Sequence, residues 1–124
     1  MKFEKGKSYT RKDISDKIRG GIQDCLPHFD NEVVAICMRQ DLNPNAPKIM
    51  LVGKGRDKIK YSEILCGQTK AVPIFIKNAV NDWKCQGYYK AAEHSKDPNV
   101  IIDHGRTSRR KDIYMVIHLE EAKQ

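Results

Sequence analysis

Residues 72–91, VPIFIKNAVNDWKCQGYYKA, decide the fold, because they contain two strand-like segments separated by a turn. The first segment, VPIFIK at 72–77, is a β-branched and apolar run in which Pro73 is expected near an edge or at the strand start. Residues 78–82 are typical of a turn. The second segment, WKCQGYYKA at 83–91, is aromatic and partly alternating, and Gly87 indicates a bulge or a close backbone approach within it.

Three further strands are expected around this pair. VVAICM at 33–38 and KIMLV at 48–52 have the length and composition of buried strands. The segment QDLNPNAP at 40–47 lies between them and is dense in turn formers. IYMVIHL at 113–119 predicts the last strand.

Residues 10–19 predict a short opening helix. Thr10 suits its N-cap, Ile14 and Ile18 repeat at helical spacing, and two glycines at 20–21 end it. The segment that follows, IQDCLPHFDNE, has no clean period and is interpreted as a loop.

A second short helix is expected over 59–66, ending near Gly67, after a flexible basic turn at 53–57. Residues 93–111 show no periodic pattern apart from VII at 100–102, so they are interpreted as a long basic loop.

This order of elements predicts an α+β domain spanning residues 1–124. Most connections are too short for repeated right-handed crossovers between parallel strands. We therefore expect a curved mixed or antiparallel β-sheet that forms a partly closed barrel with one or two flanking helices.

The charge balance gives the first indication of function. Lys and Arg number 23 against 16 Asp and Glu in 124 residues, a net charge of +7. A positive field of this kind steers a protein toward polyanions, and each phosphate contact releases counterions. We therefore expect nucleic acid as the partner, while a protein-interaction domain with an incidentally basic surface stays open.

The cysteines and the hydropathy pattern exclude several classes. The chain has four cysteines, at 25, 37, 66 and 85, with no CxxC pair, so no zinc module and no metal or cofactor is expected. The first residues, MKFEKGKSYTRK, lack the apolar segment of a secretion signal, and no apolar run has membrane-spanning length, so neither a secretion signal nor a membrane span is expected. We expect a cytoplasmic protein with reduced thiols and no membrane partner.

The tract HGRTSRRK at 104–111 holds the best phosphate-contact candidates, Arg106, Arg109, Arg110 and Lys111. Guanidinium groups match phosphate geometry with two parallel hydrogen bonds. The alternative is a solvated loop. Arg11 and Lys12 belong to a second basic patch near the amino terminus.

Two polar side chains are candidate base readers. Asn43, in the rigid turn after a buried strand, can pair with adenine through two hydrogen bonds. Gln68, after the second helix, has the same chemistry. The competing interpretation of each is a structural polar residue in a well-formed turn or helix end.

Trp83, Tyr88 and Tyr89 are candidate walls of a base pocket. Exposed aromatic rings stack on bases, and they can enclose a base that has been flipped out of the duplex. The alternative is that these rings fill the core. Strict alternation places Trp83 and Tyr89 on one face and Tyr88 on the other, unless a bulge at Gly87 breaks the pattern.

A catalytic interpretation has little support. Asp82 and Lys84 have the D-x-K spacing of metal-dependent nucleases, but no second carboxylate is placed beside them, and only Asp41 or Glu63 could be forced into that role. The histidines form no metal-binding motif. No catalytic residue is assigned, and a small metal-dependent nuclease stays as an alternative.

Several of these segments together resemble a known family. The run GKSYTRKDI followed by GG, then DLNPNAP, Gln68, VPIFIK and WKCQGYY, is similar to PUA-like domains. Within that group it most resembles the SRA-like reader domains of modification-dependent restriction proteins of the McrA type. The resemblance covers roughly residues 6–92.

The resemblance implies a curved barrel that grips duplex DNA and flips out a modified base, in a restriction or defence setting. It places Tyr9 and Arg11 near the DNA, and Trp83 and Tyr88 at the base pocket. Such readers are usually fused to an HNH nuclease, whose signatures are absent from this sequence. The alternatives are a reader domain alone, an excised fragment or a member of another PUA-like branch, with a nuclease partner or fused domain as a candidate association. Related PUA-like modules bind RNA, which keeps RNA as an alternative substrate.

Overall fold

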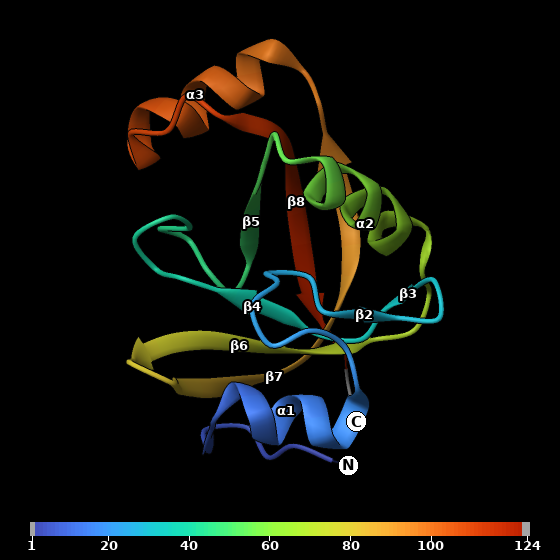
Figure 1. The fold of residues 1–124 in the computed structure, drawn as a ribbon. Helices are drawn as coiled ribbons and strands as arrows, with labels where there is room; N and C mark the ends of the chain where they lie inside the picture. Colours follow the sequence, from blue (N-terminus) through green and yellow to red (C-terminus); the bar gives the residue numbers. More distant parts are fainter. Residues whose placement is uncertain (1, 123–124) are drawn as a thin grey trace.

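A computed structural model describes residues 2–122 as an α+β fold, with three helices, a mixed six-stranded sheet and a separate two-stranded sheet in that range (Figure 1). In chain order the elements are β1 (Ser8–Tyr9), α1 (Arg11–Ile18), β2 (His28–Phe29), β3 (Glu32–Val33), β4 (Ile36–Met38), β5 (Ile49–Gly53), α2 (Arg56–Gly67), β6 (Val72–Ala79), β7 (Asp82–Ser95), α3 (Pro98–Ser108) and β8 (Ile113–Glu121).

The large sheet has the strand order β4-β6-β7-β8-β5, and β1 pairs with β7 beside this path. β4 and β6 are parallel, and the other neighbours are antiparallel. Figure 1 shows β5 and β8 running steeply across the direction of β4 and β6, so the sheet is strongly bent. β4 and β5 end the order and do not pair with each other in the described part of the chain, so the prediction of a mixed sheet is confirmed without a closed barrel.

β7 contains the bulge that Gly87 predicts. Ile74 of β6 is paired with Gly87 and the next residue, Phe75, with Cys85, which leaves Gln86 without a register partner. Gly87 has φ +106°, a conformation that side-chain-bearing residues rarely adopt. Because of this extra residue, the side chains after the bulge point to the opposite face of the sheet from the one that strict alternation predicts, so Trp83 and Tyr89 do not share a face.

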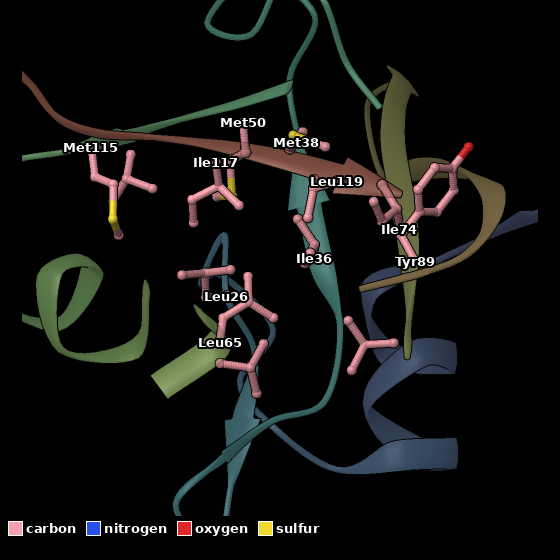
Figure 2. Packing of buried hydrophobic residues seen from close by; sticks show 13 residues of the cluster. Leu26, Ile36, Met38, Met50, Leu65, Ile74, Tyr89, Met115, Ile117 and Leu119 are labelled. Carbon is pink, nitrogen blue, oxygen red and sulfur yellow. The ribbon is translucent and has the colours of Figure 1, made fainter. Parts of the chain in front are cut away.

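The main core lies inside the bend of the sheet. Figure 2 shows Met50 and Ile117 projecting from β5 and β8 on the side of Leu26 and Leu65, the latter from α2. Methionine and branched side chains fill this volume with few voids, and their burial is the main source of stability. The cluster comprises Leu26, Val33, Ile36, Met38, Met50, Val52, Leu65, Val72, Ile74, Tyr89, Met115, Ile117 and Leu119.

Two smaller clusters cover the outer face of the sheet. Beneath α1, Phe3, Tyr9 and Phe75 form edge-to-face ring contacts with centroids 5.0 to 6.0 Å apart. Beneath α3, Val100 and Ile101 pack on an apolar group from β5 and β8. Both faces of the sheet are therefore buried, which explains why β6 begins with a continuous apolar run rather than an alternating one.

The prediction of a long basic loop over residues 93–111 is wrong. β7 continues to Ser95, and α3 occupies 98–108. Asp97 accepts a hydrogen bond from the Asn99 amide and Pro98 takes the first turn, which together start a helix. The periodicity was hidden because α3 buries none of its residues fully and faces the sheet with a short stripe only.

Smaller differences concern element ends. The segment interpreted as a loop after Gly21 contains the β2–β3 hairpin. α2 begins at Arg56, three residues before the expected start, with Gly55 as its N-cap. The three helices exceed the one or two expected. None of the helices in the described residues is long and apolar enough to cross a membrane.

Candidate nucleic-acid interface

The basic tract 106–111 lies at the end of α3 and in the connection to β8. Arg106, Arg109 and Lys111 are exposed there. They border a shallow groove of about 480 Å³ whose floor includes Ile102 and Ile113. Arg106 is carried by the last turn of α3, whereas Arg109 and Lys111 lie in the short connection between α3 and β8.

Arg110 of the same tract has a structural role instead. Its Nη1 donates to the backbone carbonyls of Leu42 and Leu51, at 3.0 and 2.9 Å. Its Nε and Nη2 form two parallel bonds with the carboxylate of Asp112, at 2.9 and 3.0 Å. These bonds hold the pKa of Asp112 below its usual value. Because these guanidinium N–H groups are already hydrogen-bonded within the protein, Arg110 holds the tract against Leu42 and Leu51 and is not available for two parallel bonds to a phosphate.

A second basic tract meets the first one around Gly53. Residues 54–60, KGRDKIK, form the β5–α2 turn and the first part of α2, and their cations Lys54, Arg56, Lys58 and Lys60 are exposed. A Cβ on Gly53 would lie 3.2 Å from Arg110 Nη2 and 3.6 Å from the Lys58 Cδ. The fold thus brings together two tracts that are about 50 positions apart in the sequence. In the sequence alone, residues 53–57 of this region indicated only a flexible basic turn.

A pocket opens beside this junction. It has a volume of about 230 Å³ and is lined by Gln23, Asp24, Cys25, Leu26, His28, Gly55, Asp57, Lys58 and Tyr61. The rings of His28 and Tyr61 are stacked, with centroids 3.4 Å apart and planes 12° apart. His28 Nδ1 lies 2.9 Å from the Leu26 carbonyl, which fixes the orientation of the ring. The pocket therefore combines an aromatic wall with polar side chains, and the sequence pattern gave no signal for the pairing of His28 with Tyr61.

The predicted aromatic pocket of Trp83, Tyr88 and Tyr89 is not formed. Trp83 is 8% exposed and packs in the cluster beneath α1, whereas Tyr89 is 6% exposed and lies in the main core. The bulge at Gly87 separates the two rings onto opposite faces of the sheet. Tyr88 is half-buried and lines a different cavity at the α1 end of the molecule. Burial raises the pKa of its hydroxyl.

The amino-terminal candidates contribute no side chain to the lining of the His28 pocket, although Arg11 bonds the backbone of Asp24, which lines it. Tyr9 is buried, and its hydroxyl accepts a hydrogen bond from the Glu4 amide at 3.0 Å. Arg11 is buried and donates from Nη2 to the carbonyls of Gly21 and Asp24, at 3.1 and 2.8 Å. Lys12 is exposed but is paired with Asp16 at 2.7 Å. Of these three side chains, Lys12 alone is accessible to a phosphate.

Asn43 and Gln68 replace missing β-sheet partners. Asn43 Oδ1 accepts from the Leu51 amide at 2.8 Å, and its Nδ2 donates to the Arg39 carbonyl at 3.2 Å. Gln68 bonds both the amide and the carbonyl of Val33. The structural interpretation left open for both residues is therefore the one that the contacts favour.

The residues of the nuclease alternative do not form a metal site. Asp82 is half-buried, and its Oδ2 accepts from Asn78 Nδ2 at 3.4 Å. Asp41 is paired with Arg39, and Glu63 with Lys96. Among residues 2–122, no group of three His, Cys, Asp or Glu side chains is placed to hold a metal ion. Asp82 and Lys84 thus have no carboxylate partner here.

No protein-family model, curated protein or solved structure matches this chain. What it does is therefore inferred from the two basic tracts, the adjoining pocket and the sequence pattern.

Proposed function

We propose that this chain is a DNA-binding reader module that recognises a modified base in duplex DNA, by base flipping, in a restriction or defence setting. The observation that carries the proposal is the meeting of two basic tracts around Gly53, beside a pocket with an aromatic wall. Phosphate contacts position a protein on DNA, and a base that is flipped out of the duplex is read in a separate pocket.

The two tracts supply the phosphate contacts. Their exposed cations are Lys54, Arg56, Lys58, Lys60, Arg106, Arg109 and Lys111. Each phosphate that is neutralised releases counterions and makes the logarithmic salt dependence of binding steeper by roughly 0.9. Several such contacts give binding that weakens steeply with salt.

The pocket beside α2 receives the flipped base under this proposal. A base that leaves the stack can lie against His28 or Tyr61, whose rings already stack on each other. Gln23, Asp24 and Asp57 then offer hydrogen-bonding groups to its edge. Extrusion costs a few kcal/mol, which stacking of about 1–3 kcal/mol and edge contacts offset. This pocket replaces the one expected from Trp83 and Tyr89.

The rest of the proposal concerns context. The strongly bent sheet is taken as a partly closed barrel of the PUA-like kind, and a nuclease partner or fused domain supplies cleavage. No residue of this chain is assigned a catalytic role. The four free thiols agree with a reducing compartment, which we take to be the cytoplasm.

A fluorescence anisotropy titration tests the proposal. Labelled duplexes carrying no modification, methylated cytosine or methylated adenine are titrated at several salt concentrations, with an RNA duplex as a further arm. We expect salt-dependent binding of DNA and tighter binding of one modified duplex. In Lys54→Gln every duplex should bind more weakly, whereas His28→Ala should mainly reduce the preference for the modified duplex. Lys48→Gln, on an exposed residue outside both tracts, is the matched charge control.

The outcomes separate the parts of the proposal. Equal affinity for plain and modified duplexes rules out base reading but leaves DNA binding. Tighter binding of the RNA duplex replaces DNA by RNA as the substrate. Binding that is absent or insensitive to salt overturns the nucleic-acid assignment altogether.

A further inference from the structure

A second cavity is lined in part by Ile18, the last residue of α1. Figure 1 shows α1 and α3 at opposite ends of the molecule. The cavity is a slot between the extended segments 32–34 and 70–73. Its apolar walls are formed by Ile18, Val34, Val72, Pro73 and Tyr88. None of the roles given above to the basic tracts or to the pocket of His28 uses this slot.

The size of the slot limits what can enter it. Its volume is about 290 Å³, just below the roughly 300–1,000 Å³ of sites that enclose a whole small-molecule ligand. One large apolar side chain is a better match, and such anchors in apolar pockets dominate many protein interfaces. The half-buried ring of Tyr88 offers such an anchor an aromatic surface.

The rim of the slot carries positive charge. Lys2 and Lys70 are exposed there, against a single carboxylate, Glu32. Lys17 lies next to Lys2, because its Nζ is 3.4 Å from the Lys2 carbonyl. Acidic residues flanking an apolar anchor would face these ammonium groups, and charge complementarity of this kind selects partners.

We propose that the slot binds an acidic peptide segment of another protein, with one large apolar side chain inserted between residues 32–34 and 70–73. The apolar walls favour an inserted side chain over a phosphate backbone, and the rim favours acidic neighbours. Because α3 and α1 lie at opposite ends of the molecule, a partner in the slot near α1 leaves the tract at 106–111 free. The inference does not depend on the proposed DNA-binding function.

The test uses three labelled peptides and the full chain without DNA. The probe is acetyl-Asp-Glu-Phe-Glu-Asp-amide, and the controls replace Phe by Gly or the acidic residues by Lys and Arg. Binding is measured by anisotropy, and the site is mapped by amide chemical shifts. We expect the acidic Phe peptide to bind best and to shift the amides of Val34, Ala71 and Tyr88.

Two variants and a control localise the binding. Lys70→Glu should weaken the acidic Phe peptide by roughly five- to tenfold, because an attraction becomes a repulsion. Val34→Trp, which fills the slot from its wall, should abolish binding. Lys48→Glu makes the same charge change on another surface and should leave affinity within about twofold.

Every other result overturns the proposal. If the Gly peptide binds with the same affinity as the Phe peptide, no apolar side chain is inserted in the slot. If the basic peptide binds with the same affinity, the positive rim does not select acidic partners. Shifts confined to 54–60 and 106–111 would mean that acidic peptides only mimic a polyanion. If the acidic Phe peptide does not bind at millimolar concentration, the proposal is likewise refuted.

Discussion

Gln68 pairs with Val33 as a neighbouring β-strand would. Its Oε1 accepts from the Val33 amide at 2.6 Å, and its Nε2 donates to the Val33 carbonyl at 3.1 Å. The Gln68 side chain thus satisfies both the amide and the carbonyl of the buried residue Val33, which lies shortly before β4. An unsatisfied buried amide or carbonyl costs free energy, so this contact stabilises the chain where α2 meets β3.

We predict that Gln68→Ala lowers the free energy of unfolding by about 1–3 kcal/mol, because two buried backbone groups lose their partner. Gln68→Glu should also destabilise, since a carboxylate cannot donate to the Val33 carbonyl. Urea denaturation measures both changes. Thr69→Ala, on the exposed neighbouring residue, is the control. If all three variants have the stability of the unmodified chain, the strand-like role of Gln68 is refuted.

Arg109 and Arg110 are adjacent but should behave differently. Arg109 is exposed, whereas Arg110 bonds two carbonyls and Asp112. Arg109→Gln should keep the thermal midpoint and reduce the salt slope of DNA binding by about 1. Arg110→Gln should lower the free energy of unfolding by about 2 kcal/mol. Calorimetry and anisotropy on both variants distinguish the two roles, and equal effects of the two substitutions on stability would contradict the assignment.

We expect Trp83 to stabilise the fold and not to contact DNA. Its ring is 8% exposed and lies 5.1 Å from the Arg11 guanidinium carbon. Trp83→Ala is expected to cost about 3–5 kcal/mol, since it opens a cavity beneath α1. Trp83→Phe keeps most of the volume and should fold, with DNA affinity close to that of the unmodified chain. A strong loss of affinity in a fully folded Trp83→Phe variant would restore Trp83 to the binding surface.

Glu63 makes stability depend on pH. Hydrogen bonds from Lys96 at 2.8 Å and Tyr114 at 2.7 Å hold its pKa below the usual 4.5. A carboxyl group whose pKa is lowered by folding stabilises the protein fully above its ordinary pKa, and this contribution is lost as pH falls through the folded-state value. Denaturation between pH 7 and pH 3 should therefore show a shallower loss of stability in Glu63→Gln. Glu93→Gln, on exposed β7, provides the control, and identical pH profiles for the two variants would exclude the effect.

The buried thiols should resist modification in the folded protein. Burial raises the pKa of the Cys37 thiol to about 12, so almost no thiolate exists near neutral pH. Cys85 is also buried, whereas Cys25 and Cys66 are partly exposed. Timed alkylation at pH 8 with mass spectrometry should modify Cys25 and Cys66 first, and Cys37 only on unfolding. Early modification of Cys37 would indicate that the sheet opens locally near β4.

The strands and the first two helices could be predicted because their signals are local. The apolar runs at 33–38, 48–52, 72–77 and 113–119 all contain strands, and Thr10 caps α1 through a capping box as expected. α3 was missed because a helix that packs on the sheet with a few residues leaves little periodicity. Its start signal, Asp97 followed by Pro98, was present in the sequence.

The site was less predictable because it depends on long-range geometry. The junction of the two basic tracts arises where Gly53 ends β5 beside Arg110 and Asp112, and no local pattern reports that approach. Polar residues such as Asn43 and Gln68 have the same chemistry whether they read a base or bond a backbone. Only the position of Leu51 or Val33 relative to them distinguishes the two roles.

The contacts at Leu51 have a consequence for association between copies of this protein. Asn43 occupies its amide and Arg110 its carbonyl, on the side of β5 that faces away from β8. A strand edge with free backbone groups is a template on which another chain can extend the sheet, and aggregation begins there. At Leu51 this template is already filled by two side chains. An added strand would have to displace both side chains, so loss of Asn43 or Arg110 would destabilise the fold and also leave a backbone group of Leu51 open to pairing with another chain.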